Sequence, residues 1–155
     1  MAEDIPEFGV AVAGADYQLR PGGYLVLRDA RGEVAVVSTP RGFFLPGGGQ
    51  EDGEIPESAA VREAEEECGL CVRVTGLLGR ADELVFAPEE GRYYRKRCTF
   101  FSAELVWCGP GWEADHELMW RREAAAALRL SHQSQRWAVS LARRLTPGMN
   151  RTRNK

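Results

Sequence analysis

The chain has 155 residues, 44% of them hydrophobic, with a formal net charge of −3 and a pI near 5.5. This length and apolar content are typical of one globular domain with a substantial core. The acidic balance disfavours a general nucleic-acid binder, which usually has a basic surplus, so we expect no stable nucleic-acid partner. We expect a single domain over residues 1–146, followed by a basic, mobile tail over residues 147–155.

The amino-terminal residues do not resemble a signal peptide. They are acidic and lack the positive segment and apolar core of a signal peptide. No apolar run of the chain approaches membrane-spanning length. We therefore expect a cytoplasmic protein with no membrane partner.

The first third of the chain predicts part of a β-sheet. Residues 8–13 and 24–28 are apolar, β-prone runs and are expected to be strands. Residues 29–32 have the composition of a hairpin turn that leads into a third strand over residues 34–38. The sheet therefore begins, at least in part, as an antiparallel one.

A glycine-rich turn follows, directly before a short segment rich in carboxylates. Pro56 suits the first position of a helix and Gly69 suits a left-handed stop, which predicts a helix over residues 56–68. Ala60, Ala64 and Cys68 recur every four positions along it. This narrow face of small side chains is expected to pack closely on the sheet.

The carboxylates of this helix predict a metal site. Glu63, Glu66 and Glu67 share one face within about one turn, so their charges would repel one another. A hard divalent cation that takes oxygen ligands would relieve this repulsion, which indicates Mg²⁺ or Mn²⁺. Arg62 can reach Glu66 one turn further on and orient the carboxylates without binding the metal itself.

The remainder of the chain predicts more strands and two further helices. Strands are expected over residues 72–78, 83–86, 97–106 and 118–120, with a turn at 87–91, and helices over 122–128 and 133–145. Strands first, one helix in the middle and helices at the end predict an α/β fold with a mixed β-sheet between helical layers.

The four cysteines allow two interpretations. Cys68 and Cys71 form a CxxC motif that, with Cys98 and Cys108, would suffice for a zinc site. Cys68 lies on the predicted buried face of the helix and Cys98 lies next to an aromatic run, so we favour small core residues. A cytoplasmic compartment also disfavours disulfides.

The segment from Gly48 to Leu70 resembles the Nudix box, G-x5-E-x7-R-E-U-x-E-E-x-G-U, where U is a bulky aliphatic residue. Every fixed position matches, and Leu70 fills the last aliphatic place; the fixed residues are Gly48, Glu54, Arg62, Glu63, Glu66, Glu67 and Gly69. Ala64 is smaller than the aliphatic residue usual in the family, which affects local packing rather than chemistry. The fixed spacing, in a loop that leads into a helix, makes the match specific.

The resemblance implies a Nudix-like α/β/α sandwich and a metal-dependent hydrolase. Members of the family cleave a nucleoside diphosphate linked to a further moiety, with a divalent ion that polarises the pyrophosphate and activates water. Carried over by position, the metal ligands would be Glu63, Glu66, Glu67 and the carbonyl of Gly47. Arg62 would orient them, and Glu54 would tie the loop to the helix or bind an additional ion.

Other catalytic and binding residues are predicted outside the box. Glu117 is the leading candidate for a general base there, in competition with Glu83 and Glu113; His116 and His132 are assigned no role. Cations for the phosphates and one aromatic ring for a base give the candidate substrate-binding residues Arg41, Arg92, Tyr94, Arg95 and Lys96. Each of these residues also has an ordinary interpretation as surface or strand packing.

The substrate is left open among pyrophosphate compounds. A nucleoside di- or triphosphate derivative is favoured, with diadenosine polyphosphates and diphosphoinositol polyphosphates as alternatives, because no subclass motif of the family is clear. Two rivals of another class are a nucleotide-binding sensor without catalysis and a zinc-stabilised interaction domain. Many relatives pair, so a homodimer is among the expected states.

Overall fold

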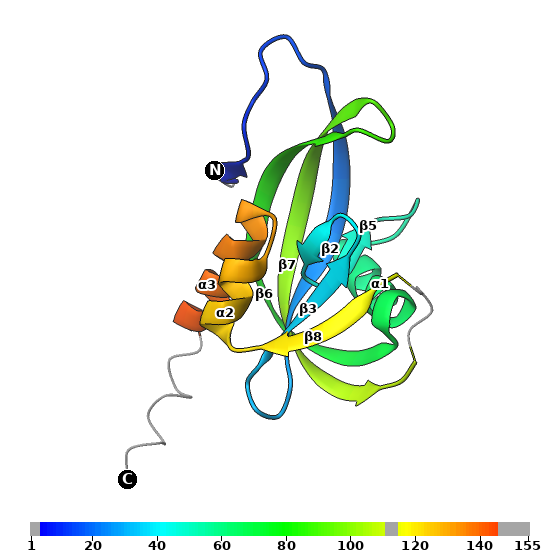
Figure 1. The fold of residues 1–155 in the computed structure, drawn as a ribbon, viewed down its shortest axis with the longest axis vertical. Helices are drawn as coiled ribbons and strands as arrows, with labels where there is room; N and C mark the ends of the chain where they lie inside the picture. The colour runs from blue at the N-terminus through cyan, green and yellow to red at the C-terminus, as the bar shows by residue number, and fades with distance from the viewer. Residues whose placement is uncertain (1–3, 111–114, 146–155) are drawn as a thin grey trace.

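The computed structural model describes residues 4–110 and 115–145, which form eight strands and three helices (Figure 1). The strands are β1 (Glu7–Phe8), β2 (Tyr17–Arg28), β3 (Val34–Thr39), β4 (Gly42–Phe44), β5 (Gly47–Gly49), β6 (Leu70–Ala87), β7 (Arg92–Cys108) and β8 (Glu117–Arg121). The helices are α1 (Pro56–Cys68), α2 (Glu123–Arg129) and α3 (Gln133–Leu145). The predicted tail over residues 147–155 lies outside the described residues.

All eight strands belong to one mixed sheet, as predicted. Its order is β1-β6-β7-β2-β3-β4, and β5 and β8 pair with β2 and β3 respectively. β6 and β7 form a long antiparallel hairpin through the predicted turn. β2 lies parallel to β7 in a continuous register from Tyr17–Tyr93 to Arg28–Glu104.

The central strands β2 and β3 are buried on both faces of the sheet, and their side chains alternate between two cores. Leu25 and Leu27 pack in a cluster with Ala60 and Ala64 of α1, whereas Val26 packs with residues of α2 and α3. Figure 1 shows α1 on one side of the sheet and α2 with α3 on the other. The predicted α/β/α sandwich is confirmed.

Helix α1 has the predicted bounds and the predicted buried face. Gly69 ends it in the left-handed region, with φ of 65°, and its N–H donates to the Glu65 carbonyl at 2.8 Å. Ala60, Ala64 and Cys68 are buried against the sheet. The contact is close: a Cβ on Gly23 of β2 would lie 1.9 Å from the Pro56 carbonyl oxygen. Only glycine therefore lets the strand approach the start of this helix.

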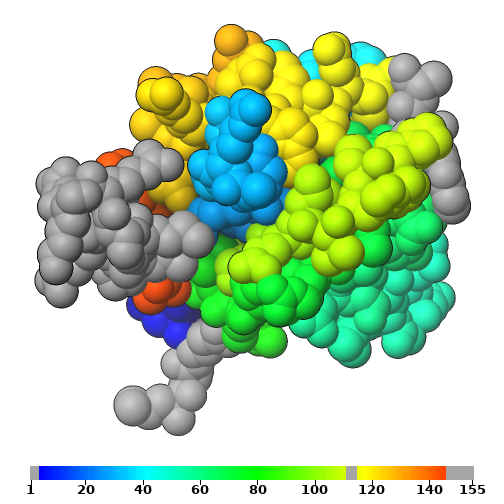
Figure 2. Space-filling view, turned by 90° about the horizontal axis from the view of Figure 1, so that it is seen from below, coloured from blue at the N-terminus to red at the C-terminus, as the bar shows by residue number. Residues whose placement is uncertain are grey.

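The turn between β2 and β3 is also as predicted. Gly32 has φ of 78° and donates its N–H to the Asp29 carbonyl at 3.0 Å. The Asp29 side chain accepts the N–H groups of Arg31 and Glu33, which is the usual way in which aspartate stabilises a turn. Figure 2 shows this turn in blue, projecting between the yellow β8–α2 segment and the lime-coloured β7.

Four predicted strands were wrong in extent. The predicted strand 8–13 ends at Phe8, because Gly9 turns the chain with φ of 92° and Val10 beyond it is 84% exposed. The predicted strands 72–78 and 83–86 are one strand, β6, which bends at three bulges instead of breaking. The strand predicted to begin at Tyr24 begins at Tyr17, because β7 pairs with the whole polar stretch before it.

Two of the four cysteines are core residues, as we favoured, whereas Cys71 and Cys108 are exposed. Cys68 and Cys98 are buried in the clusters on opposite faces of the sheet, and all four cysteines are free thiols. Burial raises the pKa of both buried thiols to about 12. The opposite placement excludes a single four-cysteine zinc site.

None of the described helices is both long enough and apolar enough to cross a membrane.

Candidate active site

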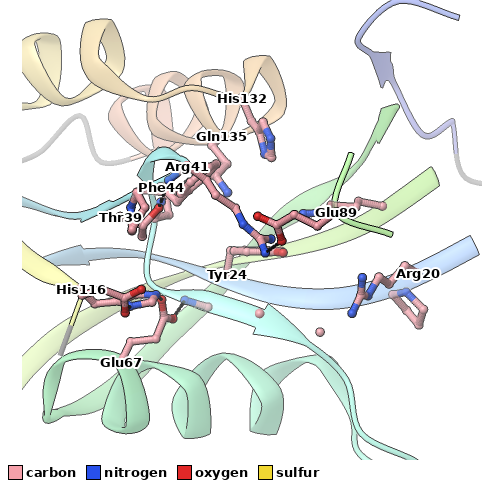
Figure 3. Close-up of a pocket in the computed structure, with 18 residues that line it drawn as sticks. Arg20, Tyr24, Thr39, Arg41, Phe44, Glu67, Glu89, His116, His132 and Gln135 are labelled. Carbon is pink, nitrogen blue, oxygen red and sulfur yellow. Dashed lines mark hydrogen bonds and ion pairs between the residues drawn. The ribbon is translucent and has the colours of Figure 1, made fainter. Parts of the chain in front are cut away.

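A pocket of about 540 Å³ opens beside the glycine strand β5. Figure 3 shows Glu67 and His116 on the α1 side of this pocket, and His132 and Gln135 on the opposite side near α3. Tyr24 and Arg41 lie between these two sides. The pocket thus joins the predicted metal-binding helix to a part of the fold more than sixty residues further along the chain.

Glu67 is the box carboxylate that lines the pocket. The residue is only 9% exposed, and its Oε1 accepts a hydrogen bond from the Gly47 N–H at 3.1 Å. Oε2 lies 3.6 Å from Nε2 of His116. The last turn of α1 therefore holds this carboxylate at the base of the pocket, next to the glycine strand.

The glycines of β5 permit backbone and carboxylate to come together. Gly47 has φ of 146°, and a Cβ there would lie 2.7 Å from the Tyr24 Cα. A Cβ on Gly48 would lie 2.7 Å from the carboxyl carbon of Glu63. Glu63 and Glu67 thus both border a strand that has no side chains of its own.

Arg62 donates hydrogen bonds to three glutamates of the box. Its guanidinium makes two hydrogen bonds to Glu54, at 2.8 and 2.9 Å, and its Nη1 reaches Glu63 at 2.9 Å and Glu66 at 3.1 Å. A further hydrogen bond to the Gly49 carbonyl, at 3.1 Å, joins this network to the glycine strand. The geometry is that of a residue that positions carboxylates, which is the role predicted for Arg62.

Glu54 ties the loop to the helix, one of its two predicted roles. Besides binding Arg62, its Oε1 accepts the N–H of Glu51 at 3.0 Å. The hydrogen bonds from Arg62, with the backbone N–H, lower the Glu54 pKa from 4.5 to about 2. The pKa of the Arg62 guanidinium rises in turn. This carboxylate is therefore charged across the whole physiological range.

The three predicted metal-binding carboxylates do not converge fully. Glu63 and Glu66 both accept hydrogen bonds from Arg62, whereas Glu67 contacts the Gly47 N–H and the His116 ring. Within residues 4–110 and 115–145, no three histidine, cysteine or acidic side chains are grouped as a metal site. The donors beside the glycine strand are nevertheless oxygens, which suit Mg²⁺ or Mn²⁺. The ligand roles stay predictions.

Glu117, the predicted base, begins β8 opposite Ser38 of β3. Its side chain is exposed and is not among those that line the pocket, whereas Asp115 and His116 just before it are. The competing candidate Glu83 is buried and accepts the Ser134 N–H at the start of α3, at 2.8 Å. The third candidate, Glu113, lies outside the described residues.

Two of the five predicted substrate-binding residues line the pocket, Lys96 and Arg41. Lys96 is half-buried, and this burial lowers its pKa from the ordinary value. Arg41 is exposed at the mouth, where it forms an ion pair with Glu89. Both are cations that can face phosphate oxygens.

Arg92, Tyr94 and Arg95 do not line the pocket in this structure. Arg92 is exposed, and Arg95 pairs with Asp82 at 3.2 Å. Tyr94 lies under the guanidinium of Arg20, 4.8 Å from its ring centre. Arg20 itself lines the pocket, so Tyr94 supports a cation that the sequence did not reveal.

Four other lining residues were missed or left without a role: His116, Phe44, His132 and Gln135. They come from three separate parts of the chain and follow no common motif. The two histidines were noticed, but nothing in the local pattern distinguished them from surface residues. Only the folded sheet brings them to the glycine strand.

Comparison with known proteins covers most of the chain. The family model described as NUDIX domain matches residues 18–136. An RNA pyrophosphohydrolase of Rhodospirillum rubrum is 42% identical over 123 residues, covering 73% of this chain and 71% of that protein. A diphosphoinositol polyphosphate phosphohydrolase 3-alpha of Mus musculus is 41% identical over 66 residues, a match that spans 41% of this chain and only 37% of the mouse protein.

Solved structures share the fold at lower identity. A NUDIX hydrolase from Nitrosomonas europaea has a TM-score of 0.65 at 19% identity, over 82% of this chain and 90% of its own. A dihydroneopterin triphosphate pyrophosphohydrolase of E. coli has a TM-score of 0.66 at 19% identity, over 77% of this chain and 92% of its own. These likenesses are evidence of a common fold.

Proposed function

The chain belongs to the NUDIX family and is a pyrophosphohydrolase, and from this premise we propose that it cleaves a nucleoside di- or triphosphate derivative with the help of Mg²⁺ or Mn²⁺. The observation that carries the proposal is the charge distribution in the pocket. The carboxylate of Glu67 lies on one side, and the cations Arg20, Arg41 and Lys96 line the same space. One pocket thus offers acidic oxygens for a metal ion and positive charge for phosphates.

The residues that would hold the ion are Glu63, Glu66, Glu67 and the Gly47 carbonyl, with Glu54 as a donor to any additional ion. A divalent ion bound there would polarise the pyrophosphate and lower the pKa of the water that attacks phosphorus. Arg62 keeps Glu63 and Glu66 oriented through its hydrogen bonds. The Gly47 N–H does the same for Glu67.

The cations would position the polyphosphate. Lys96 and Arg20 project from adjacent parallel strands, on which they are direct register partners. Arg41, from the turn before β4, adds a third positive charge at the mouth. Positive charge on both sides of a phosphate chain holds it in line for attack at one phosphorus.

The proton acceptor is the least defined role. Glu117 remains our candidate outside the box, because it follows directly on the lining residue His116. Its exposed position on β8 favours instead a box carboxylate, Glu67, which faces the pocket. A Glu117→Gln variant with unchanged kcat would assign the role to the box.

The names of two relatives indicate other candidate substrates. The Rhodospirillum rubrum protein is an RNA pyrophosphohydrolase, which makes the triphosphate end of an RNA chain a second candidate. The mouse protein acts on diphosphoinositol polyphosphates and supplies a third. Each of these compounds carries the phosphoanhydride bond that the proposed chemistry requires.

The test is phosphate release from a panel of these substrates, with a coupled pyrophosphatase throughout and a coupled phosphatase for the diadenosine polyphosphate alone. The panel contains nucleoside triphosphates, a 5′-triphosphorylated RNA oligonucleotide, a diadenosine polyphosphate and a diphosphoinositol, each with Mg²⁺, Mn²⁺ or a chelator. Glu67→Gln keeps an oxygen for the Gly47 N–H but loses the charge, and we expect a loss of about a hundredfold or more. Glu65→Gln, on the exposed face of the same helix, is the matched control.

Turnover that needs the metal and disappears in Glu67→Gln would support the hydrolase and identify its substrate class. Tight nucleotide binding without turnover on any substrate would contradict it and favour the sensor. Equal activity of the Glu67 and Glu65 variants would contradict the proposed role of Glu67.

A further inference from the structure

The α3 side of the pocket contains a buried amide with one half of its hydrogen-bonding capacity unused. Gln135 is 2% exposed, and its Oε1 accepts the Leu45 N–H at 2.8 Å. Because a backbone N–H can only donate, this contact fixes which end of the amide is oxygen. Among residues 4–110 and 115–145, this is the one hydrogen bond of the Gln135 amide, and Gln135 lines the pocket. Its Nε2 donor thus faces the cavity (Figure 3).

The side chains around this donor are aromatic and mostly uncharged. Phe44 and His132 meet edge to face, with ring centroids 5.0 Å apart, and both line the pocket. Burial, with the nearby charge of Lys96, lowers the His132 pKa to about 4, so its imidazole is neutral near pH 7. This side of the pocket offers flat apolar surface with a few directed polar groups.

Hydrogen bonds to β4 and to a carboxylate of β6 hold the chain at the start of α3, where Gln135 lies. Ser131 donates its N–H to the Phe43 carbonyl at 2.9 Å, and its Oγ accepts the Phe43 N–H at 3.0 Å. The buried Glu83 accepts the Ser134 N–H at 2.8 Å. Gln135 is therefore fixed before any ligand arrives, which is the condition for a selective hydrogen bond.

This chemistry suits a nucleobase better than a phosphorylated inositol. An inositol polyphosphate carries negative charge around its whole ring and would need more cations on this side than Lys96. A nucleobase is flat and uncharged, packs on aromatic rings, and presents acceptor oxygens or amino groups at its edge. The cations of the pocket would then face the phosphates and the α3 side would face the ring.

We propose that Phe44, His132 and Gln135 form the base-binding part of the pocket, and that the Gln135 amide donates to a carbonyl oxygen of the base. The amide cannot rotate to offer its oxygen instead, because the Leu45 N–H already binds it. Bases with a carbonyl group at this position are therefore preferred over bases with an amino group. This proposal rests on the proposed function and specifies its substrate class.

The test compares inosine and adenosine triphosphates, which differ at position 6 of the same ring system, with methyl triphosphate as a base-free substrate. Gln135→Glu keeps an acceptor for the Leu45 N–H and replaces the donor by a second acceptor. Gln133→Glu, on the exposed face of the same helix, is the matched control. We expect wild type and Gln133→Glu to prefer the inosine compound in kcat/KM by about tenfold or more, and Gln135→Glu to reverse that preference.

Phe44→Leu provides a second variant that leaves the Gln135 hydrogen bond in place. It should lower kcat/KM for both purine compounds by about tenfold and leave methyl triphosphate within about twofold of wild type. An inosine-to-adenosine ratio that is the same in wild type and folded Gln135→Glu would overturn the proposal, even with active enzyme. So would an equal loss on methyl triphosphate in Phe44→Leu. If wild type cleaves neither the purine compounds nor methyl triphosphate, the proposed function itself falls, and this inference with it.

Discussion

Arg62 and Glu54 meet through two parallel hydrogen bonds, with Nε 2.8 Å from Oε2 and Nη2 2.9 Å from Oε1. This fork geometry is available to arginine and not to lysine. The pair lies eight positions apart in sequence and joins the loop to the helix. Because the same guanidinium also holds Glu63 and Glu66, the shape of the loop and the orientation of two box carboxylates depend on one side chain.

Arg62→Lys should therefore impair catalysis while the charge is kept. A lysine cannot bind Glu54 twice and still reach Glu63, so the carboxylates lose their fixed orientation. Loss of such a supporting contact typically costs about 10- to 100-fold in activity or metal affinity, and we expect kcat/KM to fall within that range. Arg73→Lys, in the exposed pair with Glu104, is the control and should stay at the wild-type value. Equal activities of the two variants would contradict the role given to Arg62.

The Glu54 carboxylate should make stability depend on pH in the acid range. Its pKa in the folded protein, about 2, lies below its ordinary value of 4.5. The ionised Glu54 carboxylate therefore contributes fully to the free energy of unfolding above about pH 4.5, and this contribution is lost as the pH falls towards 2. The melting temperature of wild type should exceed that of Glu54→Gln most at about pH 6, and the difference should shrink by about pH 3. Glu57→Gln, exposed in the first turn of α1, serves for comparison. A wild-type advantage that is constant over this range would refute the assignment.

Gly23→Ala should destabilise the fold. The new Cβ would lie 1.9 Å from the Pro56 carbonyl oxygen and 3.2 Å from the Ala60 Cβ, so β2 and α1 would have to separate. Overpacking of this kind costs about 1–3 kcal/mol of unfolding free energy, measured by denaturant titration. At Gly76 in β6 a Cβ would come no closer than 3.4 Å to Ser102 Oγ, so Gly76→Ala should change stability by less than about 0.5 kcal/mol. Similar losses of unfolding free energy in both variants would contradict the importance of the close contact between Gly23 and Pro56.

Lys96→Met should weaken substrate binding more than it slows the chemical step. The variant keeps the buried alkyl chain but removes a charge that lines the pocket. We expect KM for a triphosphate substrate to rise by about tenfold with kcat within about threefold of wild type. Arg31→Met, in the exposed turn between β2 and β3, removes the same charge far from the pocket and should leave KM unchanged. A drop in kcat alone would point to a contact made only in the transition state.

The elements that sequence predicted best have local determinants. The bounds of α1 depend on Pro56 and Gly69, and α3 follows from its own amphipathic pattern, so both agree with the structure. The extent of β2 and β6 depends on partners. β2 begins seven residues earlier than expected because β7 supplies hydrogen bonds to its polar end, and β6 continues because bulges absorb its irregularities.

The residues of the site show the same difference between local determinants and partners that are distant in sequence. Arg62 and Glu54 have their roles within one loop and helix, where the spacing alone brings them together. The basic run 92–97 was ambiguous because a strand alternates its side chains: Lys96 reaches the pocket, whereas Arg95 and Arg97 turn to Asp82 on the other face. Gln135 could not be predicted, since its partner Leu45 lies ninety positions away in sequence.

The parallel pairing of β2 with β7 also constrains how the chain folds. It joins Tyr17 to Tyr93 and Arg28 to Glu104, so β2 cannot complete its pairing until β7, from the second half of the chain, is available. Contacts so distant in sequence carry a large loop-closure cost and slow folding. During synthesis, the box helix therefore emerges from the ribosome well before the sheet that supports it can be completed, and a chain that stops short of β7 would leave the apolar strand β2 exposed to aggregation.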